Sequence, residues 1–443
     1  MSFEATGDGA VTRFRALLQI PTVSRNDPAD VDHAAFALFH ETLAELYPLV
    51  HERLEVELID DASLLFRWAG QGTGRPTVLM AHHDVVPADE PGWRHEPFAA
   101  ELVSDRIWGR GTLDDKGALV ALLEAIEQRL ADEFTPAADV YVFSGANEET
   151  AGSGAERAVD LLAERGVRPG LVLDEGGAVA SDAFPGLDGA VAYIGVAEKG
   201  LAGIRLSVEK PGGHAATPAR DGATTTLARA IVRLERHPAP ARLTAPVAEM
   251  LRAIAPRARG TQRGLFRRPR TFRRVLTRAL ARRGGEAAAM VRTTRAVTRL
   301  TGSAGDNVIA ERATAMVNAR IAIGSTVERT ADEIRHAIGD EQVRVDVVYG
   351  NDPSPVSPNH GAEWDRLAET ILEVFPDVIV APYVMLQASD SRHFAAISDG
   401  VYRFLPFDLT TAERAALHAK DESIRVSTYL RGIAFFRRLI AKL

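Results

Sequence analysis

Segments typical of strands alternate with segments typical of helices along most of this chain. Apolar, strand-like runs occur at 78–80, 138–150 and 170–177, and stretches with apolar residues at helical spacing lie between them at 118–133 and 152–166. This alternation predicts an α/β fold in which a mostly parallel sheet is covered by helices. In such sheets ligands bind beyond the carboxyl ends of the strands, so the residues that follow each strand are the ones to inspect for chemistry.

The pattern changes in the middle of the chain, which predicts two domains. At 443 residues the chain is too long for one ordinary core. Residues 199–350 predict a small sheet with helices on one face, and the first pattern returns at 351. We therefore expect one domain formed by 1–198 and 351–443, with a smaller α+β domain inserted at 199–350. Within the insertion, about 245–298 is rich in arginine and predicts amphipathic helices with a solvated basic face.

Composition excludes several classes of protein. The net charge of −8 argues against a general nucleic-acid binder, although the arginine-rich segment keeps that alternative open. The chain has no cysteine, so a metal ion would be held by His, Asp and Glu. We see no signal peptide and no apolar stretch long enough to cross a bilayer, so we expect a cytoplasmic protein without membrane attachment.

The strand at 78–80 ends in a histidine with a carboxylate two residues later. Because a strand points residues i and i+2 to one side, His82 and Asp84 share a face and His83 looks the other way. Asp84 can accept one ring N–H of His82 and leave the other nitrogen for a metal. Taken alone, the pair would suit a buried histidine satisfied by its neighbour. A second polar motif at 109–117 in the same segment favours the metal site.

Acidic pairs at three further points complete a candidate site for two metal ions. Two such ions a few ångströms apart need about five ligands, one of them bridging. In the pair Glu148-Glu149, one carboxylate can bind metal while the other acts as general base. A lone acidic pair usually lies in a solvated loop, and only the joint occurrence at successive strand ends favours a site. The other candidates are Asp114 or Asp115, Asp174 or Glu175, and a late histidine.

At this point the sequence resembles a known family. The order of its motifs is similar to that in metallopeptidases and deacylases of the carboxypeptidase G, acetylornithine deacetylase and succinyl-diaminopimelate desuccinylase type, and most similar to the carboxypeptidase S-like branch. The resemblance covers nearly the whole chain except the arginine-rich segment. It is carried by the motifs AHHDVVP, GRGTLDDKG, ANEETAGS, LDEGG, GGHAATP, DNVIAERA, SDSRHF and LHAKDE.

The resemblance implies a catalytic domain that binds two zinc ions, and it assigns roles to individual side chains. Glu148 is the general base and Asp84 the catalytic partner that orients His82, and the peptide bond after Asp114 is often cis in this family. Glu175 is less favoured than Asp174 as a ligand, and His360, in a proline-rich loop, is the alternative to His418. Cobalt or manganese is possible in place of zinc, because N/O ligands accept all three. The implied ligands of two zinc ions per subunit are His82, Asp114 as the bridge, Glu149, Asp174 and His418.

The resemblance also assigns the inserted domain as a lid and dimerisation domain. In a homodimer, His214 would reach the neighbouring active site and donate to the developing oxyanion. Asn307 and Arg320 match a substrate-binding pair, and the Arg320 guanidinium suits a free carboxylate. The function this implies is hydrolysis of an amide bond in a small peptide or N-acyl amino acid by a water that two zinc ions activate. The alternative is a non-catalytic binding protein on the same fold.

Overall fold

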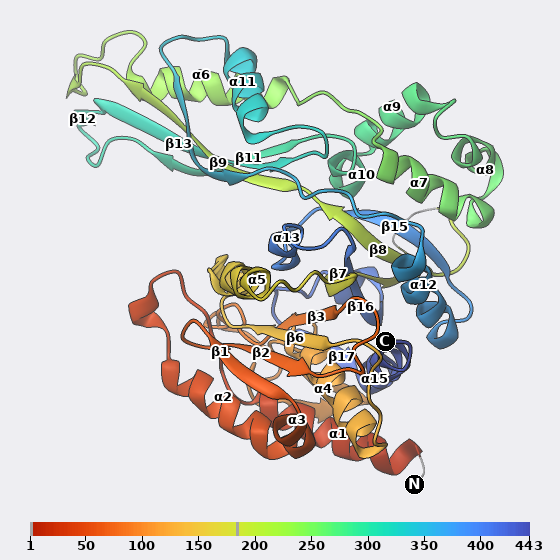
Figure 1. Ribbon diagram of the computed structural model, residues 1–443. Helices are drawn as coiled ribbons and strands as arrows, with labels where there is room; N and C mark the ends of the chain where they lie inside the picture. Colours follow the sequence, from red (N-terminus) through yellow and green to blue (C-terminus); the bar gives the residue numbers. More distant parts are fainter. Residues whose placement is uncertain (1–2, 183–185) are drawn as a thin grey trace.

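The larger of two α/β units is built on an eight-stranded mixed sheet (Figure 1). The computed structural model describes residues 3–182 and 186–443. Strand β3 pairs in parallel with β6 and β7, β16 is parallel to β7, and β15 is parallel to β8. Strand β2 pairs antiparallel with both β1 and β6, and β16 meets β8 antiparallel. The predicted α/β class is therefore confirmed. In spatial order the strands are β1 (Glu55–Ile59), β2 (Ser63–Trp68), β6 (Val140–Gly145), β3 (Thr77–His82), β7 (Leu171–Ala180), β16 (Val401–Leu409), β8 (Val191–Glu198) and β15 (Ile379–Met385).

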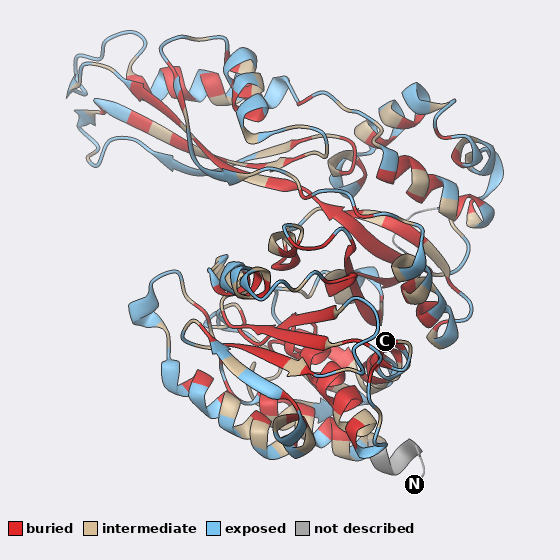
Figure 2. Cartoon of the chain, in the orientation of Figure 1, coloured by how far each residue is buried: buried red, intermediate tan, exposed pale blue. Residues whose placement is uncertain are grey.

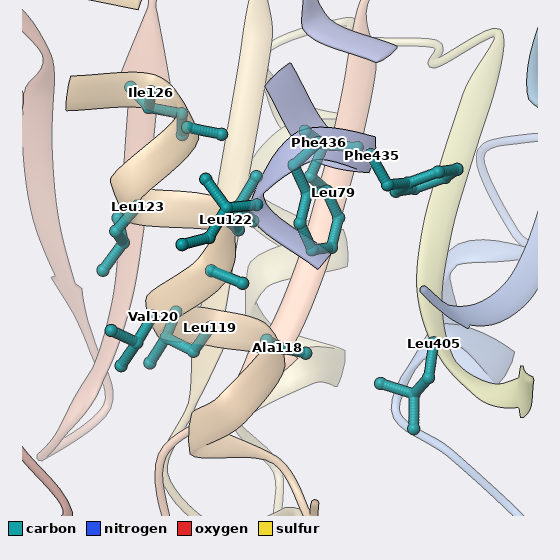
Figure 3. Packing of buried hydrophobic residues seen from close by; sticks show 14 of the residues in the cluster. Leu79, Ala118, Leu119, Val120, Leu122, Leu123, Ile126, Leu405, Phe435 and Phe436 are labelled. Carbon is teal, nitrogen blue, oxygen red and sulfur yellow. The ribbon is translucent and has the colours of Figure 1, made fainter. Parts of the chain in front are cut away.

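Helices cover both faces of this sheet. Helix α4 (Lys116–Ala131) is buried on nearly every side because it lies between the sheet and helix α15 (Val426–Ile440), and Figure 3 shows Leu122 on the side of α4 toward Phe436. Helix α5 (Gly154–Glu164) covers the opposite face, where its apolar residues pack with Phe394. The remaining helices of this unit are α1 (Phe3–Leu18), α2 (His33–Leu46), α3 (Pro48–Arg53), α12 (Ala362–Val374), α13 (Ser391–Phe394) and α14 (Thr411–Arg414).

The smaller unit is a four-stranded antiparallel sheet with two helices on one face. Strand β13 (Arg312–Ile321) alternates buried and partly exposed residues, as expected for a sheet with one face on a core and the other toward solvent. Its order is β11-β13-β9-β14, and helices α6 (Ala223–Arg236) and α11 (Val327–Ile338) close the apolar face. The other strands are β9 (Gly200–Glu209), β11 (Thr294–Thr301) and β14 (Arg344–Asn351), with the short pair β10 (Gly213–His214) and β12 (Val308–Ile309) at the outer end.

The arginine-rich segment folds into helices, but its end differs from the prediction. Its apolar residues Met250, Leu251 and Ile254 form one core with Tyr193 of β8 and Val384 of β15, so the segment covers the last strands of the large sheet (Figure 2). The predicted helical insertion is wrong at 294–298, because those residues pair with β13 as strand β11. The helices are α7 (Ala245–Ile254), α8 (Gly260–Arg267), α9 (Arg273–Arg283) and α10 (Gly285–Ala289).

The chain also forms a small third sheet of three strands. Residues 423–425 form strand β17 (Ser423–Arg425), which pairs with β5 (Arg106–Trp108) and through it with β4 (Glu101–Val103). In the part of the chain that the structure describes, every helix is too short or too polar to cross a bilayer.

Candidate metal centre

His82 lies at the carboxyl end of β3, between two carboxylates. Its ring is buried, and its Nδ1 atom is 3.0 Å from the backbone oxygen of Asp84 and 3.4 Å from that residue's Oδ1 atom. On the other side of the ring, Nε2 is 3.0 Å from Oδ1 of Asp114. Asp84 thus fixes the orientation of the ring through its contacts with Nδ1 and leaves Nε2 facing the centre of the site.

Asp84 also holds the turn that follows β6. Its Oδ1 atom accepts the backbone N–H of Glu148 and its Oδ2 atom accepts that of Glu149, each at 3.2 Å. One fully buried carboxylate therefore positions the histidine from one strand end and the two glutamates from the next. This second role of Asp84 could not be read from the sequence, because it joins residues more than sixty positions apart.

Asp114 joins two groups of possible metal ligands. Its Oδ2 atom is 2.9 Å from Nε2 of His418, which is also 3.2 Å from Oε2 of Glu149, and the Asp114–Asp115 peptide bond is cis. The first group is His82, Asp114 and Glu175, and the second is Asp114, Glu149 and His418; within each group the ligand atoms lie within 4.8 Å of one another. Asp114 belongs to both groups and is placed to bridge two cations.

The first ligand group contains Glu175 and not the predicted ligand Asp174. Asp174 is buried, and its Oδ2 atom accepts the backbone N–H of Ser391 at 2.9 Å. The sequence pattern predicts a strand that ends in these two acids and the glycines after them, but β7 continues to Ala180. Because successive side chains of a strand point to opposite faces, only one of the two acids can face His82, and that one is Glu175.

The charges of the site fit divalent cations. Burial raises the pKa of the Glu148, Glu149 and Glu175 carboxyls, and the neighbouring charge of Asp114 raises it further. Hydrogen bonds to Asp114 and Glu149 raise the pKa of His418 to about 10. The Oε1 atom of Glu149 is buried and has no hydrogen-bond partner among the described residues. Converging carboxylates with an unused buried oxygen can hold a cation, and His, Asp and Glu donors without sulfur suit zinc, cobalt or manganese.

A cavity of about 410 Å³ opens beside these ligands. Four of the ligands, Asp114, Glu149, Glu175 and His418, line it together with Glu148, and helices α7 and α10 contribute part of its wall. Sequence reasoning missed this wall; the only signal for it was the apolar face of the arginine-rich helices. The apolar lining residues include Tyr193, Met250, Met290, Tyr383, Met385 and Leu405.

Three predicted substrate residues lie away from this centre. His214 is exposed on β10, where its Nδ1 atom accepts the N–H of Ala216, and Asn307 is next to it, since its carbonyl accepts the N–H of Ala215. Arg320 is half-buried on β13. These three are absent from the described cavity wall, so their roles stay predictions that need a neighbouring subunit or closure of the inserted domain. The alternative histidine, His360, is exposed and belongs to neither ligand group.

Known proteins resemble this chain along nearly its whole length. The probable carboxypeptidase S-like protein 2 of Dictyostelium discoideum is 33% identical over 94% of this chain and 81% of its own. The human N-fatty-acyl-amino acid synthase/hydrolase PM20D1 is also 33% identical, over 96% of this chain and 86% of its own.

Solved structures show the same fold. An M20 family metallo-carboxypeptidase from Sulfolobus solfataricus aligns with a TM-score of 0.72 at 16% identity, covering 99% of each chain. Human carnosine dipeptidase 1 aligns with a TM-score of 0.69 at 16% identity, covering 99% of this chain and 96% of that one. The model of peptidase family M20/M25/M40 matches residues 78–442. This chain therefore belongs to peptidase family M20/M25/M40 and is an enzyme that hydrolyses amide bonds, which excludes the non-catalytic alternative.

Proposed function

We propose that this enzyme is a two-zinc hydrolase that cleaves the amide bond of N-acyl amino acids with long apolar acyl chains. The single observation that carries the proposal is the apolar wall that residues such as Met250, Met290 and Tyr383 form in the cavity beside the ligand groups. A dipeptide needs no such extended apolar wall. The name of the human relative, an N-fatty-acyl-amino acid synthase/hydrolase, supports the same substrate class.

The ligand groups define where the metal ions would sit. In this proposal His82, Asp114 and Glu175 hold one ion, and Asp114, Glu149 and His418 hold the other. Bound zinc lowers the pKa of a water and polarises the substrate carbonyl. The large unit, from 1–198 and 351–443, supplies all these ligands, and 199–350 acts as the lid and dimerisation domain of a homodimer.

Glu148 is placed to move the proton of the reaction. Its carboxylate lines the cavity and has no hydrogen-bond or ion-pair partner in the described part of the chain. Burial raises its pKa, so the carboxyl can take a proton from the attacking water and hold it until the leaving amine nitrogen needs it. Asp84 keeps Glu148 in place through the backbone N–H of that residue.

The acyl chain would lie along the apolar wall. Each methylene group transferred from water into such a cavity contributes about 0.8 kcal/mol, which corresponds to roughly a fourfold gain in affinity. We expect kcat/KM to rise with acyl length until the cavity is full. The amino acid would then remain at the polar end, where the predicted carboxylate partner Arg320 requires closure of the inserted domain.

The test is a panel of N-acyl phenylalanines with chains from two to sixteen carbons, measured beside dipeptides. Long chains should give the highest kcat/KM, and Glu148→Gln should lower kcat by about 10²-fold or more on the best substrate. The matched control is Glu286→Gln, which changes a glutamate that lines the same cavity outside both ligand groups. Preference for dipeptides over every acyl amino acid would refute the substrate class, and an active Glu148→Gln enzyme would refute the role of Glu148.

A further inference from the structure

The basic surface of the arginine-rich helices has no role in the chemistry described so far. Residues 250–285 contain twelve arginines and neither lysine nor any acidic residue, in a chain whose net charge is −8. Only the inner, apolar side of these helices faces the substrate cavity. The outer side therefore calls for a separate explanation.

Five arginines from three segments converge on a groove of about 530 Å³. Arg273, Arg274 and Arg278 come from helix α9, Arg242 from the loop before α7, and Arg292 from the segment after α10. The rest of the wall consists of small or apolar residues and one threonine, without a carboxylate. The groove is thus a strongly positive hollow rather than a continuation of the catalytic cavity.

The positive charges of this groove are not balanced by the protein. Among the described residues, ion pairs form at neighbouring arginines such as Arg259 with Asp188, but at none of the five groove arginines. The Nε atom of Arg292 is buried and finds no hydrogen-bond acceptor in the described chain. Like charges repel, so an anion that occupies the space between them would relieve this repulsion and be attracted by all five arginines.

We propose that this groove is a binding site for a multiply charged phosphate group. The planar guanidinium fork donates two parallel hydrogen bonds to phosphate oxygens, which explains a cluster made only of arginine. A groove of this volume admits a short polyphosphate or the headgroup of an anionic phospholipid. An aromatic side chain on which a base could stack is missing from its described wall, which disfavours a single-stranded nucleic acid.

The first experiment is calorimetric titration of the zinc-loaded enzyme with tripolyphosphate at low salt. The double variant Arg273→Gln/Arg278→Gln should bind at least tenfold more weakly than the native enzyme. The matched control, Arg263→Gln/Arg267→Gln, removes the same charge from exposed arginines of α8 outside the groove and should change the affinity less than threefold. Both variants should keep the native rate on an N-acyl amino acid, which shows that they fold.

A second arm separates the sources of the phosphate. The enzyme is sedimented with vesicles of phosphatidylglycerol and, for comparison, of phosphatidylcholine. A lipid headgroup is identified if the native enzyme sediments with the phosphatidylglycerol vesicles, tripolyphosphate competes with this binding, and the groove variant stays in solution. Tripolyphosphate binding without vesicle binding identifies a free phosphate compound.

Three results would overturn the site. The first is absence of binding to the native enzyme at millimolar tripolyphosphate. The second is equal weakening by both double variants, with vesicles, duplex DNA or tripolyphosphate as the ligand, since this would describe a general basic face. The third is full binding by the groove variant, which would place the anion elsewhere, for example at the metal ions.

Discussion

At the residue scale, the adjacent acids Asp174 and Glu175 make different contacts, and a matched pair of variants distinguishes their roles. Glu175 groups with His82 and Asp114, whereas Asp174 accepts a backbone N–H from Ser391. Glu175→Gln replaces a charged ligand with a weak neutral one, so we expect the enzyme to lose one zinc ion and to turn over about 10²-fold more slowly. Asp174→Asn keeps an oxygen for the Ser391 N–H and should retain both ions. Zinc content by mass spectrometry and the turnover rate on the best substrate are the measurements.

The opposite pattern, with zinc lost in Asp174→Asn and kept in Glu175→Gln, would restore the assignment made from the sequence. Loss of zinc in both variants would instead point to a folding defect, which circular dichroism of each purified variant detects.

Strand-end reasoning located the cluster of candidate metal ligands but not every member of it. His82, Glu149 and His418 could be proposed from motifs, because each follows a strand or stands in a recognisable order. The choice between Asp174 and Glu175 depends on which face of β7 each side chain occupies, and a single sequence does not carry that information when the strand runs past both. The link from Asp84 to the backbone of Glu148 is likewise a contact between distant segments.

At the scale of elements, long periodic segments were predictable and short ones were not. Helix α4 and the buried strands on either side of it follow from apolar runs of typical length. Strands β4 and β5 have three residues each, too few to show a period. The arginines that continue into strand β11 predict a helical insertion there, although its structure is decided by pairing with β13.

The junction between the two sheets contains a buried lysine that makes stability depend on pH. Lys199, between β8 and β9, is 1% exposed and donates to the carbonyls of Ala289 and Arg292 at 3.1 and 2.9 Å. Burial, with a contribution from Arg320, lowers its pKa to about 7. The unfolded chain, with an ordinary lysine pKa, binds more protons than the folded one above pH 7. Stability should therefore rise with pH from about 7 toward the unfolded pKa.

Urea unfolding of the native enzyme and of Lys199→Met checks this. The variant lacks the titrating amine, so the difference in unfolding free energy should grow in favour of the native enzyme by about 1.4 kcal/mol per pH unit between pH 7.5 and 9.5. Below pH 6 the difference should be constant, which serves as the internal control. A difference that stays constant across the whole range would show that Lys199 does not titrate as described.

On the scale of the whole molecule, the sequence does not show which distant segments pack together around the core. The arginine-rich helices lie within the inserted sequence, yet their apolar side packs on β15, more than ninety residues further along the chain. That contact builds the apolar wall of the cavity and turns the arginines outward. Hydrophobic periodicity predicted the helices and their two faces, but it does not name the surface on which the apolar face packs.

Metal removal should loosen the large unit as a whole, because its predicted ligands come from five separate segments. A bound ion favours the folded state by about 2.7 kcal/mol when its free concentration is a hundredfold above Kd, so chelation should lower Tm by several degrees and abolish activity, and zinc should restore both. Glu148→Gln is the informative control: it keeps all five ligands and should show the same Tm response while remaining inactive. If chelation abolished activity but left Tm unchanged in both proteins, His82, Asp114 and His418 would not be held together by metal, and their closeness would be a property of the fold alone.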